Sequence, residues 1–364
     1  MLERGDPLRG LLGVVLALVL VALVGWFLVI GKALLLPIFI AIISIYILTG
    51  ASNALSLMPY ASNLPERMRR LLVLAVSLLS FLFLGGVMIS TAGQINDRLS
   101  EYQRNITTLL STALTAFGID NPDWQKIWTD ATSGISLRKL SGRFLSSLSA
   151  AAGTLSLIII YAVFLMGERG GFAHKIAVAL PNDADNRAET IVRSINRAIS
   201  DYLAVKTLVN VVLGGISFVV MWAFGIDFAL FWAILIGLLN YIPYVGSLLG
   251  VMFPVALSMA QFGSVQTSLA IAVLLMAVQA WMGNSLEPRL IGRKVNMSPF
   301  VVLVALSLWT SLWGIPGAIL AIPLTSIIAI IMGNFASTRP FAVLLSEDVN
   351  VFATEAEIKT DPAI

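Results

Sequence analysis

The chain has 364 residues, of which 58% are apolar and only 12% are charged, and its mean hydropathy is +0.91. Soluble domains carry about 25% charged residues, so the composition predicts an integral membrane protein with the lipid bilayer as its main partner. The net charge of +3 is scattered between apolar segments, which argues against a nucleic-acid partner. There is no cysteine, which excludes disulfides and thiolate metal sites, and we expect neither a metal nor a cofactor.

Six apolar segments are candidates for full membrane spans, because about 20 apolar residues cross a hydrocarbon core of about 30 Å. In chain order they are residues 11–30, 33–48, 71–90, 150–166, 209–224 and 268–282. A second apolar segment follows the first at once, so we expect the first to be a retained span and not a signal peptide. Gly31 and Lys32 separate these two segments and predict a tight hairpin.

Two polar modules interrupt the apolar segments. Residues 94–149 begin with apolar side chains at steps of three and four, which is typical of an amphipathic helix. They fit either a helical hairpin outside the bilayer or a helical extension of the neighbouring spans. Residues 181–207 predict another amphipathic helix, in which Glu189 pairs with Arg193 four residues later. We expect this helix to lie on the membrane surface, either as a linker or as a coupling element.

The distribution of Lys and Arg predicts the orientation, because short cytoplasmic loops are enriched in these residues. Arg4 and Arg9 place the N-terminus in the cytoplasm, and the basic loop 67–70 returns there after two spans. Module 94–149 then lies outside and the basic stretch 168–207 inside. The polar tail at the C-terminus is expected in the cytoplasm.

Residues 208–338 contain only five charged side chains and are broken twice, at 240–246 and at 313–317. Proline and glycine within apolar segments free backbone groups, which is tolerated where these are buried in protein or line a watery cavity. A single crossing of 228–260 would leave the basic residues 289–294 outside. We therefore expect a re-entrant hairpin whose arms have about 14 residues, or about 21 Å of helix each. Residues 299–332 predict a second hairpin.

The predicted fold is an all-α polytopic membrane protein with about six full spans and two re-entrant broken-helix hairpins, eight apolar membrane segments in all. Two span-plus-hairpin units, 208–260 and 266–333, form an inverted-topology repeat, and tips of such hairpins meet near the bilayer midplane at a transporter's binding site. The predicted domains are the first three spans (1–93), the module outside the bilayer (94–149), the fourth span with the interfacial helix (150–207), the transport core (208–335) and the tail (336–364).

Three motifs, in this order, resemble the signatures of the autoinducer-2 exporter family of bacterial permeases. They are Asn240-Tyr-Ile-Pro243-Tyr-Val-Gly246 with Gly250 and Pro254, Leu286-Glu287-Pro288-Arg-Leu-Ile-Gly292 with Pro299, and Gly314-Ile-Pro316-Gly317 with Pro323. The resemblance covers nearly the whole chain. It implies a multi-span permease of the bacterial inner membrane that forms homo-oligomers and exports a small polar solute such as autoinducer-2. Some relatives are linked instead to sodium or lithium exchange for protons, which stays the alternative.

The candidate substrate path combines neutral hydrogen-bonding groups with the freed backbone of the breaks. It comprises Asn240, Tyr241, Pro243, Gly246, Asn284, Glu287, Gly314 and Gly317. Residues expected to shape the hairpins and motifs are Gly250, Pro254, Pro288, Gly292, Pro299, Pro316 and Pro323. The glycines serve either close helix packing or gating. Leucine at Gly246 or Gly317 is expected to block transport without preventing insertion, because leucine is favourable in lipid.

Two carboxylates are candidates for ion coupling. Glu287 lies near membrane depth, where an ionisable residue points to function; its alternative role is an interfacial ion pair with Arg289 or Arg293. Asp227 is the second candidate, and its alternative role is to cap the helix that follows.

Other functional classes lack their motifs. The sequence has neither a phosphate-binding G-x-x-x-x-G-K-[ST] loop nor an H-E-x-x-H zinc motif, so we expect neither an ATP-driven pump nor an enzyme. A non-transporting scaffold would not need two polar-lined breaks. The sequence therefore predicts a secondary transporter for a small polar solute or for a monovalent cation and a proton, in which residues 208–333 move against the first spans.

Overall fold

The computed structural model describes residues 7–56, 64–116, 153–154, 156–165, 187–291 and 296–348. These ranges are helical and contain no strand, which confirms the predicted all-α class. Seven helices in them are long and apolar enough to cross a membrane. This set differs from the six predicted spans, because the second arm of each broken pair also qualifies by length. The described part of the fourth predicted span, Ser156–Leu165, is shorter than the others.

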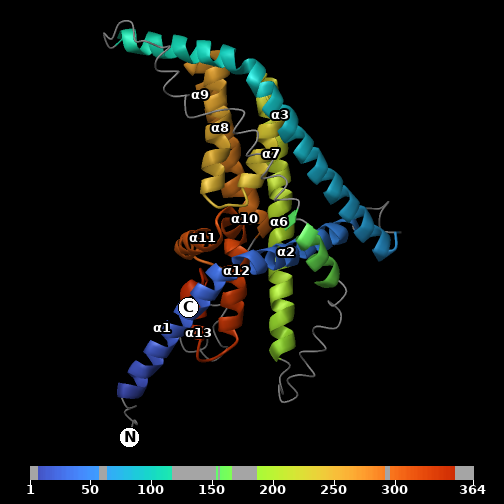
Figure 1. The fold of residues 1–364 in the computed structure, drawn as a ribbon, viewed down its shortest axis with the longest axis vertical. Helices are drawn as coiled ribbons and strands as arrows, with labels where there is room; N and C mark the ends of the chain where they lie inside the picture. Colours follow the sequence, from blue (N-terminus) through green and yellow to red (C-terminus); the bar gives the residue numbers. More distant parts are fainter. Residues whose placement is uncertain are drawn as a thin grey trace.

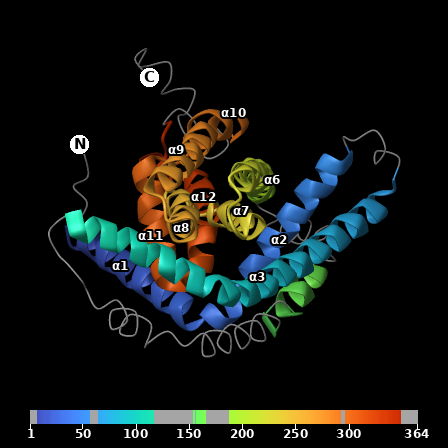
Figure 2. The same ribbon diagram turned by 90° about the horizontal axis from the view of Figure 1, so that it is seen from above.

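The first three helices form a layer along one side of the molecule. They are α1 (Pro7–Ile30), α2 (Lys32–Ser56) and α3 (Glu66–Ala116). Figure 2 shows them as an arc, with the C-terminal helices gathered on its inner side. The apolar side chains of α1 and of the first part of α3 are largely exposed, as expected for a surface that faces lipid, whereas α2 buries Ala41, Ile43 and Ile45.

The tight hairpin predicted at Gly31 and Lys32 is wrong. The Gly31 N–H donates to Phe27 O at 2.7 Å, and Leu35 N donates to Gly31 O at 2.8 Å. Helical hydrogen bonding therefore passes through the junction, and α2 continues from α1 with a bend (Figure 1). A glycine between two helical segments weakens the helix without reversing the chain.

Residues 94–116 continue the third predicted span without interruption, so α3 is one helix of 51 residues. This is the helical extension that the sequence left open, at least for this part of the module; residues 117–149 lie outside the described ranges. Figure 1 shows α3 rising along one side and then turning across the ends of α8 and α9. Similarly, the amphipathic segment from Arg187 is continuous with the fifth span, in α6 (Arg187–Ala223). The predicted pair of Glu189 and Arg193 is confirmed at 2.5 Å.

The C-terminal half consists of short helices on either side of two breaks. They are α7 (Ala229–Leu239), α8 (Val245–Phe262), α9 (Val265–Trp281), the π-helical turn η1 (Met282–Leu286), α10 (Glu287–Ile291), α11 (Pro299–Trp313), α12 (Ile315–Gly333) and α13 (Arg339–Leu345). α7 packs against α8, and α11 packs against α12. The arms are unequal, with 11 and 18 residues around the first break and 15 and 19 around the second. The arms of about 14 residues predicted for the first hairpin are therefore wrong.

Two buried clusters hold this half together, and α6 contributes to both. One contains Leu213 and Met221 of α6 with side chains of α7, α9 and η1. The other contains Ile199 and Leu203 of α6 with Trp309, Trp313 and other side chains of α11 and α12. Ile242, from the first break, belongs to this second cluster. The two breaks are therefore joined through one apolar core.

Candidate functional site

The first break, residues 240–244, follows from its local sequence. Pro243 lacks the N–H that a continuing helix would use, and Tyr244 adopts φ +60°. The second arm then starts so close to the first that a Cβ on Gly246 would overlap the carbonyl oxygen of Leu239. Gly250, one turn later, lies against Ile236, where a Cβ would be 3.4 Å from Cγ1. Glycine here lets α7 and α8 pack closely.

The second break uses the same kind of contact. Gly314 adopts φ +69° between α11 and α12, and Pro316 occupies the first turn of α12, where its missing N–H costs nothing. A Cβ on Gly317 would overlap the carbonyl oxygen of Trp309. Any side chain at Gly246 or Gly317 thus requires the two arms to separate, which gives both glycines a packing role. Leucine at either position is then expected to disturb folding as well as transport.

Polar side chains gather at the first break. Asn240 is buried and its Nδ2 donates to Asn210 Oδ1 of α6 at 2.8 Å. The hydroxyls of Thr207 and Tyr241 lie 2.7 Å apart. Asn210 Nδ2 is buried beside the Tyr241 hydroxyl and makes no hydrogen bond of regular geometry with the described residues. Buried polar atoms are normally paired, so this free donor is a candidate contact for a solute.

A groove of about 450 Å³ between α6 and α7 adjoins these groups. Its polar end is formed by Thr207, Asn210 and Tyr241, and its remaining lining is apolar or glycine: Val211, Gly214, Gly215, Phe218, Leu230, Ala233, Ile234, Gly237 and Leu238. Gly214 and Gly237 allow the two helices to approach, because a Cβ on either would lie 3.0 Å from a backbone oxygen of the other helix. An apolar groove with a few convergent polar groups is typical of a small-molecule site.

The polar groups on α6 were not anticipated as site residues. Tyr202, Lys206, Asn210 and Gly214 follow one another at intervals of four, and the first three side chains are buried. Residues four apart share one face of a helix, so Tyr202, Lys206 and Asn210 form a polar stripe on α6 that ends at Gly214. The signal was present in the sequence, because polar residues at this spacing at the start of an apolar segment indicate a face directed into protein.

Glu287 is paired across the structure with Lys206, whose Nζ lies 2.5 Å from Glu287 Oε1. An ion pair was the alternative role for Glu287, but its partner among the described residues is Lys206 and not Arg289; Arg293 lies outside those residues. The Lys206 side chain is only 6% exposed, and that of Glu287 is 22% exposed. The pair therefore joins α6 to α10 in a largely buried setting.

A π-helical turn sets the direction of Glu287. In η1 the Glu287 N–H donates to Met282 O, five residues earlier. Pro288 follows and has no N–H to donate, which weakens ordinary α-helical bonding at this point. Asn284 lies in η1 but is exposed, and it does not line the groove between α6 and α7. The structure therefore brings Asn240 and Tyr241 together but leaves Asn284 apart from them.

Asp227 lies at the opposite end of α6 and does not cap α7, whose N-cap is Phe228. Its Oδ2 accepts a hydrogen bond from Tyr102 of α3 at 2.8 Å. Burial raises the pKa of the Tyr102 phenol, and the hydrogen bond to Asp227 raises it further, so the phenol stays protonated as the donor. The cap predicted for Asp227 is wrong because α3, not α7, supplies its partner.

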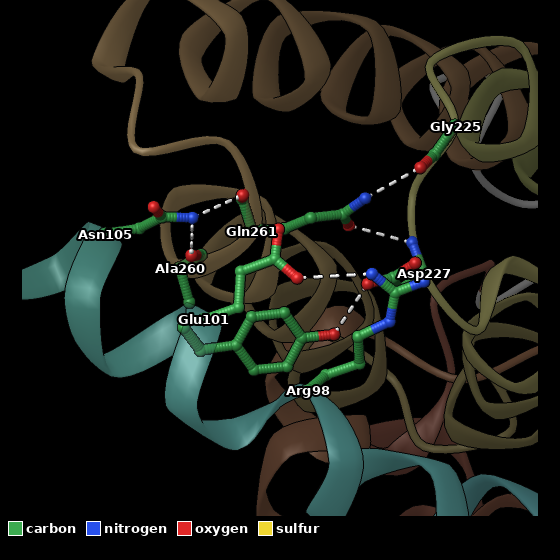
Figure 3. A network of polar contacts seen from close by, with 8 residues as sticks. Arg98, Glu101, Asn105, Gly225, Asp227, Ala260 and Gln261 are labelled. Carbon is green, nitrogen blue, oxygen red and sulfur yellow. Dashed lines mark hydrogen bonds and ion pairs between the residues drawn. The ribbon is translucent and has the colours of Figure 1, made fainter.

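Further hydrogen bonds extend this contact into a network (Figure 3). Gln261 Nε2 donates to Gly225 O, and Gln261 Oε1 accepts from Asp227 N, both at 2.8 Å. Asn105 Nδ2 of α3 donates to Ala260 O at 3.0 Å and to Gln261 O at 2.6 Å. Helix α3 thus holds the α6–α7 turn and the end of α8 together.

Three other predicted motif residues are prolines at defined positions in the helices. Pro254 and Pro323 are fully buried within α8 and α12, and Pro299 starts α11 after the N-cap Ser298. Gly292 lies outside the described residues. Across the described ranges, no three His, Asp or Glu side chains are grouped to hold a metal ion.

Comparison with known proteins places this arrangement among transporters. Residues 12–337 match the family described as AI-2E family transporter. The AI-2 transport protein TqsA of Escherichia coli K12 is 30% identical over 285 residues, which cover 76% of this chain and 81% of that protein. A Haemophilus influenzae protein named as a candidate transport protein is 25% identical over 349 residues, which cover 93% of this chain and 96% of that protein. A Borreliella burgdorferi protein named in the same way is 29% identical over 249 residues, 68% of each chain. The matched range includes both breaks, the groove and the ion pair.

Proposed function

This chain belongs to the AI-2E family of transporters, and on that premise we propose that it exports a small polar solute such as autoinducer-2 across the bacterial inner membrane. The observation that carries the proposal is the polar end of the α6–α7 groove. There Thr207 and Tyr241 present hydroxyls, and Asn210 has a buried free donor. These neutral groups suit the hydroxyl and carbonyl oxygens of a small polar solute.

The two broken pairs provide the proposed mechanism. In this proposal, α7–α8 and α11–α12 are re-entrant hairpins that enter from opposite sides, within an inverted repeat. The packing of α7 on α8 and of α11 on α12, together with the shared cluster at Ile242, supports such an arrangement. Residues 208–333 move as a unit against the layer of α1, α2 and the first part of α3, and this movement exposes the groove to one side and then the other. In this proposal both termini lie in the cytoplasm, and copies of the chain associate as homo-oligomers.

A second candidate function is sodium or lithium exchange for protons. The observation that favours it is the ion pair of Lys206 and Glu287, since an exchanger needs a carboxylate that binds a proton and a cation in turn. Asp227, the other carboxylate of the core, faces a neutral phenol at the far end of α6. Of the two, Glu287 is therefore the better placed for exchange.

The test is a flux assay on the purified full chain in liposomes. Autoinducer-2 release and sodium flux are measured separately under imposed proton and sodium gradients. Tyr241→Phe removes the hydroxyl that faces Thr207 and should lower solute flux by about 2- to 10-fold, the effect of one lost hydrogen bond. Tyr244→Phe is the matched control, because Tyr244 is exposed and does not line the groove.

Each outcome decides between the candidates. Solute release that falls in Tyr241→Phe and not in Tyr244→Phe supports the exporter and its site. Sodium–proton exchange without solute release in the unaltered chain would favour the exchanger. Equal solute flux in all three proteins would remove the groove from the transport path.

A further inference from the structure

The Lys206–Glu287 pair has an unusual setting for two charges. The Lys206 ammonium is almost fully buried on α6, and its 2.5 Å contact with Glu287 Oε1 supplies its counter-charge. A buried ammonium without such a partner is strongly unfavourable, so the position of α10 against α6 depends on the charge of Glu287. The carboxylate is the more exposed partner, and it is therefore the one that a small ion from solution reaches first.

The polypeptide is built to hold this contact. The π-helical turn η1 places one additional residue in the turn before Glu287, which rotates the carboxylate by about 100° relative to an uninterrupted α-helix. Such turns occur mostly as single insertions and often at functional sites. α10 packs against α6 along this contact. The geometry thus directs a carboxylate at Lys206.

Among the residues that the structure describes, few other ionisable groups lie near the pair. Tyr202 lies one turn before Lys206 on α6, and Tyr241 lies in the first break beside Thr207. Asp201 also lies on α6, and Arg289 on α10 is exposed. The other elements packed against this part of α6, namely α7, α9, η1 and α12, contain no ionisable side chain; α2 contributes Lys32 and Tyr46.

We propose that Lys206 acts as a tethered cation on Glu287, and that a proton or a small monovalent cation competes with it for the carboxylate. The pair is then the coupling site of the transporter. This inference rests on the proposed function above and adds the ligand class and the residue that competes with it. In the resting state Glu287 is satisfied by Lys206, and no external ion is held.

Binding changes the charge of the site in a defined way. When a proton adds to a Glu287 oxygen, or a sodium ion binds there, the net charge of the pair rises from zero to plus one. The Lys206 ammonium then loses its counter-charge and becomes unfavourable where it is buried. The α6–α10 contact opens so that Lys206 reaches water, and this movement is communicated along α6 to Thr207 and Asn210 at the groove. Loss of the ion closes the contact again.

The test measures cation binding directly, without any solute or flux. Radioactive sodium binding to the purified full chain in detergent is measured at several pH values. Lys206→Gln should bind sodium about tenfold or more tightly than the unaltered chain, because a unit positive charge next to the carboxylate has been removed. Glu287→Gln should lose the binding. Asp227→Asn is the matched control, since it removes the other core carboxylate and should leave binding unchanged.

A double variant protects the test against a folding defect. Lys206→Gln with Glu287→Gln removes both charges and leaves no unpaired ion, so it should fold even where a single variant does not. It should bind no sodium and should move solute only down its own gradient, whatever the proton gradient. Equal sodium affinity in Lys206→Gln and the unaltered chain, or unchanged binding in Glu287→Gln, would overturn the inference. Absent solute release with these binding results intact would overturn only the proposed solute.

Discussion

The two breaks of the C-terminal half share one backbone solution and differ in what surrounds it. In each, an apolar helix ends and the next begins with a proline in or beside the turn. The following helix lies so close that a glycine, Gly246 or Gly317, faces a carbonyl oxygen of the preceding arm. The shared contact is what makes a broken helix pair possible. It carries no information about the solute.

The surroundings separate the two breaks. Asn240 and Tyr241 at the first break bond to polar groups of α6 beside the groove. At the second break, Trp313 is only 1% exposed and packs on Phe39 and Trp309. Its Nε1 donates to Leu28 O of α1 at 3.0 Å. The first break is therefore suited to contact a solute, and the second is anchored in the core. Two breaks with the same backbone contact need not have the same function.

The largest effect is expected for the close contact between a glycine and a carbonyl oxygen that both breaks share. Gly246→Ala and Gly317→Ala should each greatly reduce the yield of folded protein, because the added Cβ overlaps a carbonyl oxygen that cannot move alone. Size-exclusion profiles and thermal unfolding of the purified protein measure this loss. Gly215→Ala on α6 is the control, since a Cβ there meets no atom within 4 Å. If Gly317→Ala were as stable as Gly215→Ala, the common packing role would be refuted.

A smaller effect is expected where the breaks differ. Trp313→Leu removes the hydrogen bond to Leu28 and part of the aromatic cluster, and it should lower the free energy of unfolding by about 2 to 4 kcal/mol. Thermal unfolding measures the loss, and solute flux per folded molecule should stay within about twofold of the unaltered chain. Tyr241→Phe is expected to show the reverse, with reduced flux and nearly unchanged stability. A strong change in solute preference in Trp313→Leu would mean that the second break also contacts the solute.

The smallest expected effect concerns backbone strain. Each break contains one residue with positive φ, Tyr244 in the first and Gly314 in the second. At Gly314 ψ is −146°, a backbone region that is essentially restricted to glycine and costs another residue about 1 to 3 kcal/mol, so Gly314→Ala should destabilise the protein by about that amount. Tyr244→Gly should leave the protein equally stable or slightly more stable, because relief of strain exceeds the entropy cost of glycine by less than about 1 kcal/mol. Thermal midpoints of the two variants should therefore shift unequally, and parallel shifts would contradict this account.

Much of the fold could be predicted from local sequence. Apolar segments of the right length located most of the helices, and Pro243 and Gly314 located both breaks, because each residue acts on its own backbone. Continuity was harder to predict. Polar residues from 94 onward left a separate module and a helical extension open, and since nothing between 94 and 116 stops a helix, α3 continues through them. Gly31 was misread for a related reason, since one glycine bends a helix without ending it.

The site was only half predictable. Asn240, Tyr241 and Glu287 were found because each lies in a distinctive motif. Their partners on α6 were missed, because pairing depends on which helices lie side by side, and Lys206 is 81 positions from Glu287. The π-helical turn that directs Glu287 has no clear pattern in its own five residues. Its physical cause is Pro288, the residue that follows Glu287, because a proline has no N–H for an α-helical hydrogen bond. The proline therefore indicates an irregular turn at this point of the sequence.

The contact between Trp313 and Leu28 has a consequence for how the protein is made. The two residues are 285 positions apart, so this contact is among the least local in the chain. At about 5 to 20 residues per second, the ribosome needs on the order of 15 to 60 s to deliver Trp313 after Leu28. The nascent α1 must therefore reside in the membrane for that time without its final neighbour. Assembly of the second break is therefore a late step of biogenesis, and a chain interrupted before α11 holds α1 mainly through α2.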